Sequence, residues 1–270
     1  SKTSMSFPIN LQPREYQKNI LNTAKEKNTL VCLPTGTGKT KLAILLAAER
    51  ATIFPESKIV ICSPTKPLVN QICQECRECL TLDETKINTV TGSTQPAERK
   101  KIWNRSSIII ATPQTMQNDI AKQNYNLSDV SLLVIDECHR SKMRFANTIV
   151  TKEYSLQSKN KRILALTASP GATKEKIDEI CKNLFIEAVE IRTETDEDLS
   201  PYIQEKEIDY IKVDLTQDLK RILALIKQVY HARLESLRKC GMNKPVGIIN
   251  KTDLLKLQKY FQSQIASGNR

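Results

Sequence analysis

The strongest chemical signal in the sequence is a glycine-containing loop between a short apolar run and an amphipathic stretch. The loop reads Leu33-Pro34-Thr35-Gly36-Thr37-Gly38-Lys39-Thr40. Glycines let backbone N–H groups surround a phosphate, Lys39 reaches the β- and γ-phosphates, and the Thr40 hydroxyl ligates Mg²⁺. The sequence therefore predicts a site for a nucleoside triphosphate with Mg²⁺, although Leu33 stands where the general pattern has its first glycine.

An acidic pair follows another apolar run about a hundred residues later. Asp136 and Glu137 come directly after the run 132–135 and precede Cys138 and His139. Ligands of a parallel sheet bind at the carboxyl ends of its strands, so this pair is predicted to meet the phosphate loop. Asp136 would hold the metal, and Glu137 would polarise the water that attacks the γ-phosphate.

Small hydroxyl residues mark a third strand end. Thr167, Ala168 and Ser169 follow the apolar run 162–166, and a neighbouring strand would place Thr167 and Ser169 beside His139. Alone, such residues are typical of an ordinary strand-to-helix turn. Their interest comes from the two motifs upstream.

Alternating apolar and amphipathic segments predict the scaffold that positions these residues. Seven runs are expected to be strands: 29–33, 58–62, 87–90, 107–111, 131–135, 162–166 and 187–191. Helices are expected between them at 39–50, 67–80, 97–104, 113–121 and 174–184. Near-continuous apolar runs are typical of strands buried on both faces. The predicted fold class is therefore α/β, with a central, mainly parallel sheet flanked by helices.

The pattern changes after about residue 195. Residues 193–201 are acidic and turn-like, 207–215 read as one alternating strand, and 216–240 and 252–266 read as helices. The expected domains are residues 1–200 and residues 201–270, the latter holding a connecting strand and the beginning of a helical unit. Because the apolar stripe of such a helix pair needs a partner, the chain is expected to be the N-terminal part of a longer protein.

Composition narrows the function classes. The 270 residues carry 41 Lys and Arg against 30 Asp and Glu, a formal net charge of +11 that favours a polyanionic partner such as nucleic acid. No run approaches the ~20 apolar residues of a membrane span, and no signal peptide is evident, so an intracellular protein without a membrane partner is expected. Cys73, Cys76 and Cys79 lack a fourth ligand and are predicted to be packed thiols, which leaves Mg²⁺ as the expected metal.

These motifs resemble motifs I, II and III of the superfamily 2 helicases, and residues 13–17 resemble the adenine-reading segment of that superfamily. The resemblance implies these ATP-binding residues: Arg14, Gln17, Pro34, Thr35, Gly36, Thr37, Gly38, Lys39 and Thr40. It implies these catalytic residues: Lys39, Asp136, Glu137 and His139. Mg²⁺ would be held by Thr40 and Asp136, and Thr167 and Ser169 would couple the ATP site to the nucleic-acid face.

Three further segments resemble loops that face nucleic acid in that superfamily. Residues 64–71 are similar to motif Ia, 91–92 to motif Ic and 112–115 to motif Ib. Short hydroxyl, glycine and lysine residues suit contacts to backbone phosphates, which carry no sequence information. The contacts implied are at Thr65, Lys66, Pro67, Thr91, Gly92, Thr112 and Pro113.

Nearly the whole chain resembles the archaeal Hef helicase–nucleases and the Fanconi anaemia M-type translocases. The segments that carry this likeness are 64–71, 90–94, 98–103, 110–114, 129–133, 167–171, 177–186, 192–194, 200–202 and 265–269. The resemblance implies the first RecA-like lobe of an ATP-dependent DNA helicase that acts on forked or branched DNA in replication-fork repair and recombination. It also implies a second RecA-like lobe in the same polypeptide, without which this chain would be nearly inactive. An archaeal cytoplasm, or the nucleus in a eukaryote, is the implied location.

Two alternatives stay open at this point. Hef-like proteins usually have alanine where this chain has Cys138, and cysteine there is more usual in RNA sensors of the RIG-I type and in Dicer helicases. An ATPase stimulated by double-stranded RNA is therefore one alternative. The other is a non-hydrolysing nucleotide-binding module that recruits partners, which would bind nucleotide without turning it over.

Overall fold

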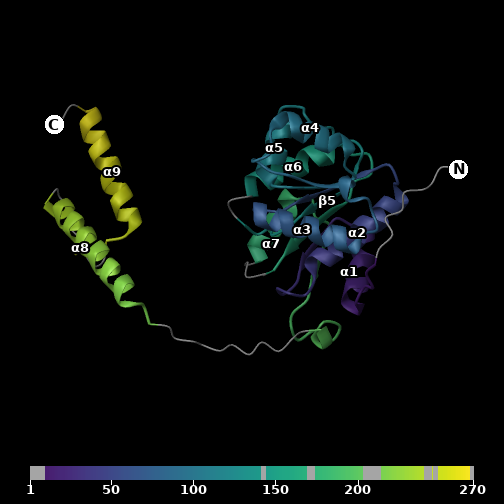
Figure 1. Ribbon diagram of the computed structural model, residues 1–270, viewed down its shortest axis with the longest axis horizontal. Helices are drawn as coiled ribbons and strands as arrows, with labels where there is room; N and C mark the ends of the chain where they lie inside the picture. Colours follow the sequence, from purple (N-terminus) through teal and green to yellow (C-terminus); the bar gives the residue numbers. More distant parts are fainter. Residues whose placement is uncertain are drawn as a thin grey trace. The chain divides into compact units, whose positions relative to one another are not determined.

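The computed structural model describes residues 10–140, 144–168, 174–202, 214–239, 245 and 249–267. The chain divides into two compact units, Ser1–Glu205 and Lys206–Arg270. The first is built from a sheet with helices on both faces, and the second holds two helices (Figure 1).

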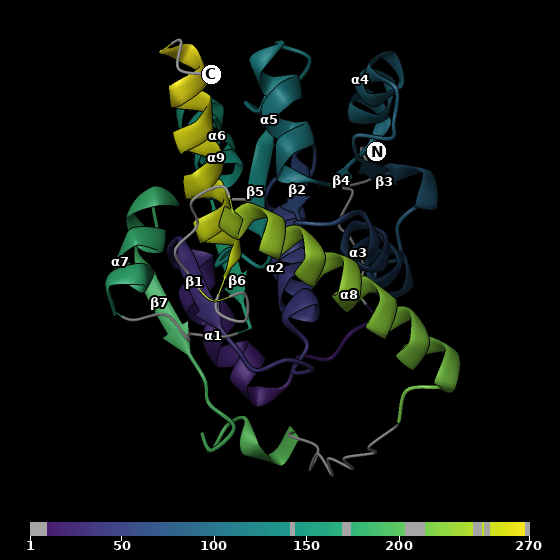
Figure 2. The same cartoon turned by 90° about the vertical axis from the view of Figure 1, so that its left-hand side faces the viewer.

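Seven strands form a single parallel sheet in the first unit. They are β1 (Thr29–Cys32), β2 (Lys58–Cys62), β3 (Ile87–Val90), β4 (Ile108–Ala111), β5 (Val130–Ile135), β6 (Ile163–Thr167) and β7 (Ala188–Ile191). Their order is β3-β4-β2-β5-β6-β1-β7, and every neighbouring pair is parallel (Figure 2). The predicted α/β fold is confirmed, with each strand within one residue of its expected bounds. Because all strands run the same way, their carboxyl ends share one edge of the sheet.

Helices cover both faces of this sheet. One face carries α1 (Glu15–Glu26), α2 (Lys39–Ile53) and α3 (Lys66–Cys79), and the other carries α4 (Pro96–Arg105), α5 (Pro113–Ala121), α6 (Arg144–Gln157) and α7 (Lys174–Asn183). Figure 1 shows α2 and α3 on one side of β5, and α4, α5 and α6 on the other. Two 3₁₀ segments, η1 (Glu84–Lys86) and η3 (Ser200–Tyr202), complete the elements that the structure describes in this unit.

Two of these helices were not among the expected elements. The sequence predicted no helix for α1 or for α6, and α6 contains four consecutive β-branched residues at 148–151, which lower helix propensity. Packing overrides that preference, because Val150 and Tyr154 of α6 are each 1% exposed. Tertiary burial therefore decides the conformation of this segment.

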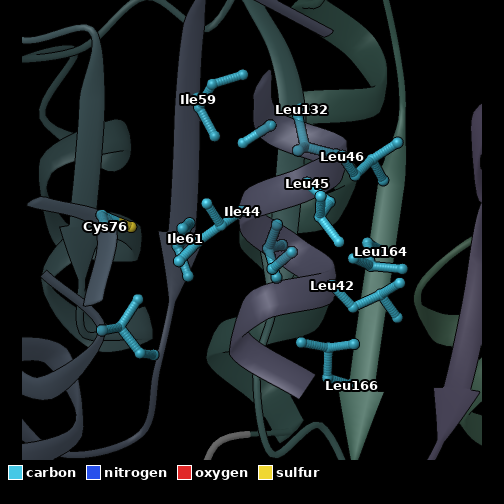
Figure 3. Close-up of a cluster of buried hydrophobic side chains, with 14 of the residues drawn as sticks. Leu42, Ile44, Leu45, Leu46, Ile59, Ile61, Cys76, Leu132, Leu164 and Leu166 are labelled. Atoms are coloured by element: carbon cyan, nitrogen blue, oxygen red, sulfur yellow. The ribbon is translucent and has the colours of Figure 1, made fainter. Parts of the chain in front are cut away.

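The strands alternate their side chains between two apolar layers. On one face, α2 packs against Ile59 and Ile61 of β2, Leu132 of β5, and Leu164 and Leu166 of β6 (Figure 3). On the other face, Val60, Leu133 and Ala165 of the same strands pack in the layer of α4 to α7. Successive residues of a strand point to opposite faces, so burial on both sides needs the near-continuous apolar runs seen here. These layers hold the strand ends that carry the site.

The second unit consists of α8 (Gln217–Lys239) and α9 (Lys251–Ala266), close to the helices expected at 216–240 and 252–266. Among the residues of this unit that the structure describes, Leu234 and Ile249 form its buried apolar cluster. The apolar stripe expected on α8 is exposed, with 40–62% of each side chain accessible at Leu219, Leu223, Ile226 and Val229. Most of the strand predicted at 207–215 lies outside the described residues. In the parts of the chain that the structure describes, no helix has both the length and the apolar character that crossing a bilayer requires.

Candidate nucleotide site and neighbouring loops

The glycine-containing loop leaves β1 and ends at the first turn of α2. Gly36 and Gly38 both have φ +79°, in the left-handed region that favours glycine. A Cβ at Gly36 would meet open space, whereas a Cβ at Gly38 would lie 3.3 Å from Nε2 of Gln17. Two left-handed residues followed by a helix N-terminus provide free backbone N–H groups for an anion.

Leu33 stands where the general phosphate-loop pattern has glycine, and the loop accommodates its side chain because that side chain is buried. Leu33 is 1% exposed and packs in the core on the α1–α3 face of the sheet. Its backbone N–H donates to the carbonyl oxygen of Thr167 at 3.1 Å, which extends the pairing of β1 with β6. The side chain at position 33 therefore points into the protein interior.

Lys39 lies at the mouth of the loop, near both acidic residues. Its Nζ donates to the carbonyl oxygens of Leu33 at 3.3 Å and Pro34 at 3.2 Å. Burial lowers the pKa of Lys39, and the carboxylates of Glu137 and Asp136 act in the opposite direction. The structure therefore brings together the predicted phosphate-binding lysine, which is the first residue of α2, and the predicted acidic pair, which directly follows β5.

Helix α1 is docked directly onto the loop. The hydroxyl of Tyr16 donates to the carbonyl oxygen of Thr37, and Nε2 of Gln17 donates to that of Gly38 at 3.4 Å. The amide oxygen of Gln17 accepts a hydrogen bond from the backbone N–H of Arg14 at 2.9 Å. These bonds fix the orientation of the Gln17 side chain beside the loop, where the adenine-reading residues were expected.

Tyr202 is a neighbour of this region that the sequence did not reveal. The Arg14 guanidinium carbon lies 4.9 Å from the centroid of the Tyr202 ring, and the rings of Tyr16 and Tyr202 are 5.7 Å apart. Leu199, which is fully buried, anchors the turn that carries Tyr202. A contact between residues so far apart in the chain has no local sequence pattern.

A cavity of about 450 Å³ opens between the loop, α1 and α3. It is lined by Arg14, Gln17, Gly36, Thr37, Gly38, Lys39, Thr40, Lys41, Gln71, Glu75, Glu78 and Cys79. This volume falls within the roughly 300–1,000 Å³ of small-molecule sites. Of the predicted nucleotide-binding residues, Pro34 and Thr35 are not among those that line it. The wall that α3 contributes was not predicted.

The metal-holding candidate Asp136 sits at the end of β5. Its Oδ2 accepts a hydrogen bond from Oγ of Ser63 at 2.8 Å. Burial raises the pKa of Asp136, and the neighbouring charge of Glu137 raises it further, while the bond from Ser63 and the charge of Lys39 lower it. Ser63 was not predicted; the available signal was its place directly after β2, the strand paired with β5.

The residues after Asp136 form a chain of polar contacts. Glu137 has φ +50°, an uncommon left-handed conformation for a residue with a side chain. Its Oε2 lies 3.5 Å from Nε2 of His139, and Nδ1 of His139 lies 2.8 Å from Oγ1 of Thr167. The structure therefore brings Thr167 to His139. Ser169, the other predicted coupling residue, lies outside the described residues.

The donor set at this site suits Mg²⁺. The hydroxyl of Thr40 and the carboxylate of Asp136 are hard oxygen ligands, and Mg²⁺ usually combines one or two such groups with water and substrate phosphates. Across the described parts of the chain, no group of three or more His, Cys, Asp or Glu side chains is arranged to hold a metal. Cys73 and Cys76 are buried in the core as expected, and Cys79 is partly buried, packs against the same core and also lines the cavity.

The predicted nucleic-acid loops follow β2, β3 and β4 at the same edge of the sheet. Among their residues, Lys66, Pro67 and Gly92 are exposed, and Thr65 and Thr112 are half-buried. These groups are accessible to a ligand that lies along this edge.

Two of the predicted contact residues have buried side chains that shape their loops. Thr91 is 5% exposed, and its hydroxyl lies 2.9 Å from that of Ser93. Pro113 is buried at the start of α5. Thr112 and Thr115 share a hydroxyl–hydroxyl contact of 2.8 Å across the same helix start.

Comparison with known proteins places this geometry among helicases. The model of the DEAD/DEAH box helicase family matches residues 14–177. A Methanocaldococcus jannaschii protein that bears the name of an ATP-dependent RNA helicase is 40% identical over 250 residues, covering 93% of this chain and 32% of that protein. The ATP-dependent DNA helicase fml1 of Schizosaccharomyces pombe is 38% identical over 233 residues, covering 86% of this chain and 28% of that protein.

A mouse Fanconi anaemia group M protein homologue is 34% identical over 254 residues, covering 94% of this chain and 12% of that protein. The crystal structure of the Pyrococcus furiosus Hef helicase domain is similar with a TM-score of 0.69 and 39% identity, covering 96% of this chain and 55% of that one. The chain thus spans a third or less of the length of these curated relatives.

Proposed function

The chain belongs to the DEAD/DEAH box helicase family, and we propose that it is the first motor lobe of an ATP-driven DNA helicase or translocase acting on forked or branched DNA in replication-fork repair and recombination. One observation carries the proposal. A phosphate loop after β1 and the pair Asp136 and Glu137 after β5 lie at the same edge of the sheet. The name of the fission yeast relative, a DNA helicase, and the likeness to Hef support DNA as the partner.

The proposed reaction is hydrolysis of ATP by in-line attack of water on the γ-phosphorus. Lys39 and the loop N–H groups hold the phosphates, while Arg14 and Gln17 hold the adenine. Glu137 orients the attacking water and accepts its proton as the bond between the γ-phosphorus and ADP breaks. Bound Mg²⁺, with Thr40 and Asp136 as its protein ligands, would neutralise charge on the phosphate oxygens.

Coupling to nucleic acid is proposed to pass through the contacts beyond Glu137. His139 contacts both Glu137 and Thr167. A change in charge at the γ-phosphate would therefore alter the position of Glu137 and, through His139, that of Thr167 at the end of β6. Lys66, the backbone of Gly92 and the hydroxyl of Thr112 are proposed to contact the phosphate backbone of DNA without reading its sequence.

The motor needs a second half. We propose that a second RecA-like lobe in the same polypeptide completes the ATP site, and that residues 201–270 begin the insertion between the lobes. An arginine finger is worth about 10³–10⁵ in rate where it completes such a site. The isolated chain is therefore expected to bind ATP and hydrolyse it very slowly. We propose that the protein is located in the cytoplasm of an archaeon or the nucleus of a eukaryote.

An ATPase stimulated by double-stranded RNA is the rival, because one similar protein bears the name of an RNA helicase and because of Cys138. The structure weakens the second argument. Cys138 is 3% exposed and packs in the core, and its N–H donates to the carbonyl oxygen of Leu166 at 3.0 Å. A side chain buried in this way does not touch a ribose hydroxyl, so it does not distinguish RNA from DNA.

The test is steady-state ATP hydrolysis by the full-length polypeptide with forked DNA, linear duplex DNA and blunt double-stranded RNA at equal nucleotide concentration. A Glu137→Gln variant is the control. Greater stimulation by forked DNA than by the other two, absent in the variant, is expected. Stimulation by RNA alone would replace the proposal with the RNA-dependent ATPase. Nucleotide binding without turnover on any of the three would favour the recruiting module.

A further inference from the structure

A buried ion pair joins α4 and α5, two of the three helices that follow the proposed nucleic-acid loops. Arg99 lies on α4 and Asp119 on α5, and their side chains are 10% and 0% exposed. Nε of Arg99 donates to Oδ2 of Asp119 at 2.7 Å, and Nη2 donates to Oδ1 at 2.8 Å. This two-bond geometry fixes both the distance and the relative orientation of the partners.

The same arginine holds the turn after β3. Nη1 of Arg99 donates to the carbonyl oxygen of Thr94 at 2.7 Å, and the N–H of Thr94 donates to that of Thr91 at 3.0 Å. The exposed Gly92 lies within this turn. Arg99 is therefore bonded to the Thr91–Thr94 turn and, through Asp119, to the C-terminal part of α5, the helix whose first residue is Pro113 and whose N-cap is Thr112.

The remaining hydrogen-bonding capacity of Asp119 is filled locally. The hydroxyl of Tyr125 donates to Oδ2 at 2.7 Å, and Nδ2 of Asn124 donates to Oδ1 at 3.1 Å. The ring of Tyr125 is stacked on Trp103 of α4 at 4.4 Å between centroids. Burial alone would raise the pKa of Asp119, but the hydrogen bonds from Arg99, Tyr125 and Asn124 together lower it. The carboxylate is thus charged and saturated at neutral pH.

Stability is a poor explanation for such a pair. Replacing a buried ion pair by apolar residues of similar size is often neutral or stabilising, because two charges no longer have to leave water. What an apolar pair does not reproduce is the directional fork. The value of Arg99 and Asp119 is therefore geometric: they fix α5 relative to the turn after β3, and the N-terminal end of α5 carries the loop after β4.

We infer that Arg99 and Asp119 are positioning residues for nucleic-acid binding, which hold the Thr91–Thr94 turn and the start of α5 at the separation needed to contact successive phosphates of one strand. This inference rests on the proposed function, which assigns those loops to the DNA backbone. Arg99 itself is buried and does not touch the DNA.

The test uses the full-length polypeptide with fluorescence anisotropy of labelled forked DNA over a range of salt concentrations. The variants are Arg99→Lys, which keeps the charge but loses the fork, and the charge-neutral pair Arg99→Met with Asp119→Leu, which fills the space without directional bonds. The matched control is Arg144→Lys, which alters the exposed two-bond pair of Arg144 with Glu179 (2.8 and 2.9 Å) on α6 and α7. Thermal unfolding confirms that each variant is folded, and the Kd of a fluorescent ATP analogue is measured in parallel.

Both Arg99 variants are expected to bind forked DNA about tenfold more weakly, the effect of losing one hydrogen bond to a charged group. The slope of log Kd against log salt should not change, because no charge that meets DNA is removed. The Kd of the ATP analogue should equal that of the wild type, and Arg144→Lys should bind DNA normally. If Arg99→Lys fails to fold, the variant with both Arg99→Met and Asp119→Leu still tests the inference, because it leaves no buried charge unpaired.

Two outcomes would overturn the inference while leaving the proposed function standing. Wild-type DNA affinity in the folded double variant would show that the pair only fills space. A salt slope lower by about 1 would show that Arg99 contacts a phosphate directly. A wild-type protein that binds ATP but no forked DNA would instead overturn the proposed function, and this inference with it.

Discussion

Oγ1 of Thr167 lies 2.8 Å from Nδ1 of His139. Thr167 is the last residue of β6, and His139 lies in the turn that follows the adjacent strand β5; Nε2 of His139 is also 3.5 Å from Oε2 of Glu137. A histidine held through one ring nitrogen presents its other nitrogen in a fixed direction. The side chain proposed to orient the attacking water is thereby tied to the end of β6.

Removing the hydroxyl of Thr167 should weaken this tie without touching the nucleotide. For Thr167→Val in the full-length polypeptide, we expect DNA stimulation of ATP hydrolysis to fall about 2–10-fold, the effect of one ordinary hydrogen bond. Basal hydrolysis should stay within about twofold. Thr151→Val is the matched control, since Thr151 is fully buried and its hydroxyl has no hydrogen-bond partner in the described structure. Equal losses in both variants would mean that the effect is general.

Glu137→Gln separates binding from turnover. The substitution keeps the size of the side chain but removes the base, so we expect kcat to fall by about 10²–10⁴. The Kd of ATP should change little, because phosphate binding is assigned to Lys39 and the loop. Single-turnover hydrolysis and equilibrium binding on the same preparation check this. Turnover within tenfold of the wild type would assign the water-orienting role to another group.

Much of this arrangement was predictable because its signals are local. The near-continuous apolar runs of β4 and β5 predict strands buried on both faces. The residues of the loop at 33–40 are sufficient to predict that it binds a phosphate. The resemblance to Hef and Fanconi anaemia M-type proteins is confirmed by the family match and by the relatives. The roles of individual residues stay predictions.

The features that could not be predicted from the sequence depend on tertiary contacts. The β-branched segment 148–151 is helical because α6 is packed on the sheet, a choice that propensity opposes. Ser63 contacts Asp136, and Tyr202 contacts Arg14. Each contact joins segments that are far apart in the sequence. Cys79, the last residue of α3, packs against the core as expected, but its place on the cavity wall was not predicted.

The two loop glycines should differ in their tolerance of a side chain. Both have φ +79°, where a Cβ costs roughly 1–2 kcal/mol. Gly36→Ala adds no contact, whereas Gly38→Ala brings its Cβ to 3.3 Å from Nε2 of Gln17. We therefore expect Gly38→Ala to lower the melting temperature and the ATP affinity more than Gly36→Ala does. Thermal unfolding and titration with a fluorescent ATP analogue measure both effects. The opposite order would show that Gln17 is not fixed beside the loop.

Acid should selectively remove the stabilisation that depends on Asp119. Its hydrogen bonds from Arg99, Tyr125 and Asn124 outweigh burial and lower its pKa below that of the unfolded chain. A lowered pKa gives stability that is fully present above the unfolded pKa and is lost as the pH falls through the folded pKa. The difference in free energy of unfolding between wild type and Asp119→Asn should therefore be constant near neutrality and shrink below about pH 4. Urea unfolding at a series of pH values measures it; a difference independent of pH would contradict the assignment.

Cys79 offers a reporter of nucleotide binding in the unmodified protein. It lines the same cavity as Lys39 and Thr40, and burial raises the pKa of its thiol, so alkylation is best followed at mildly alkaline pH. ATP that fills the cavity should slow alkylation of Cys79 several-fold. Cys181 on α7 is also partly buried but packs in the layer of α4 to α7, and its alkylation rate should be unaffected. Peptide mass mapping after timed alkylation distinguishes the two thiols. Equal protection of both would indicate a general tightening of the fold, and protection of neither would place the nucleotide away from the wall that α3 provides.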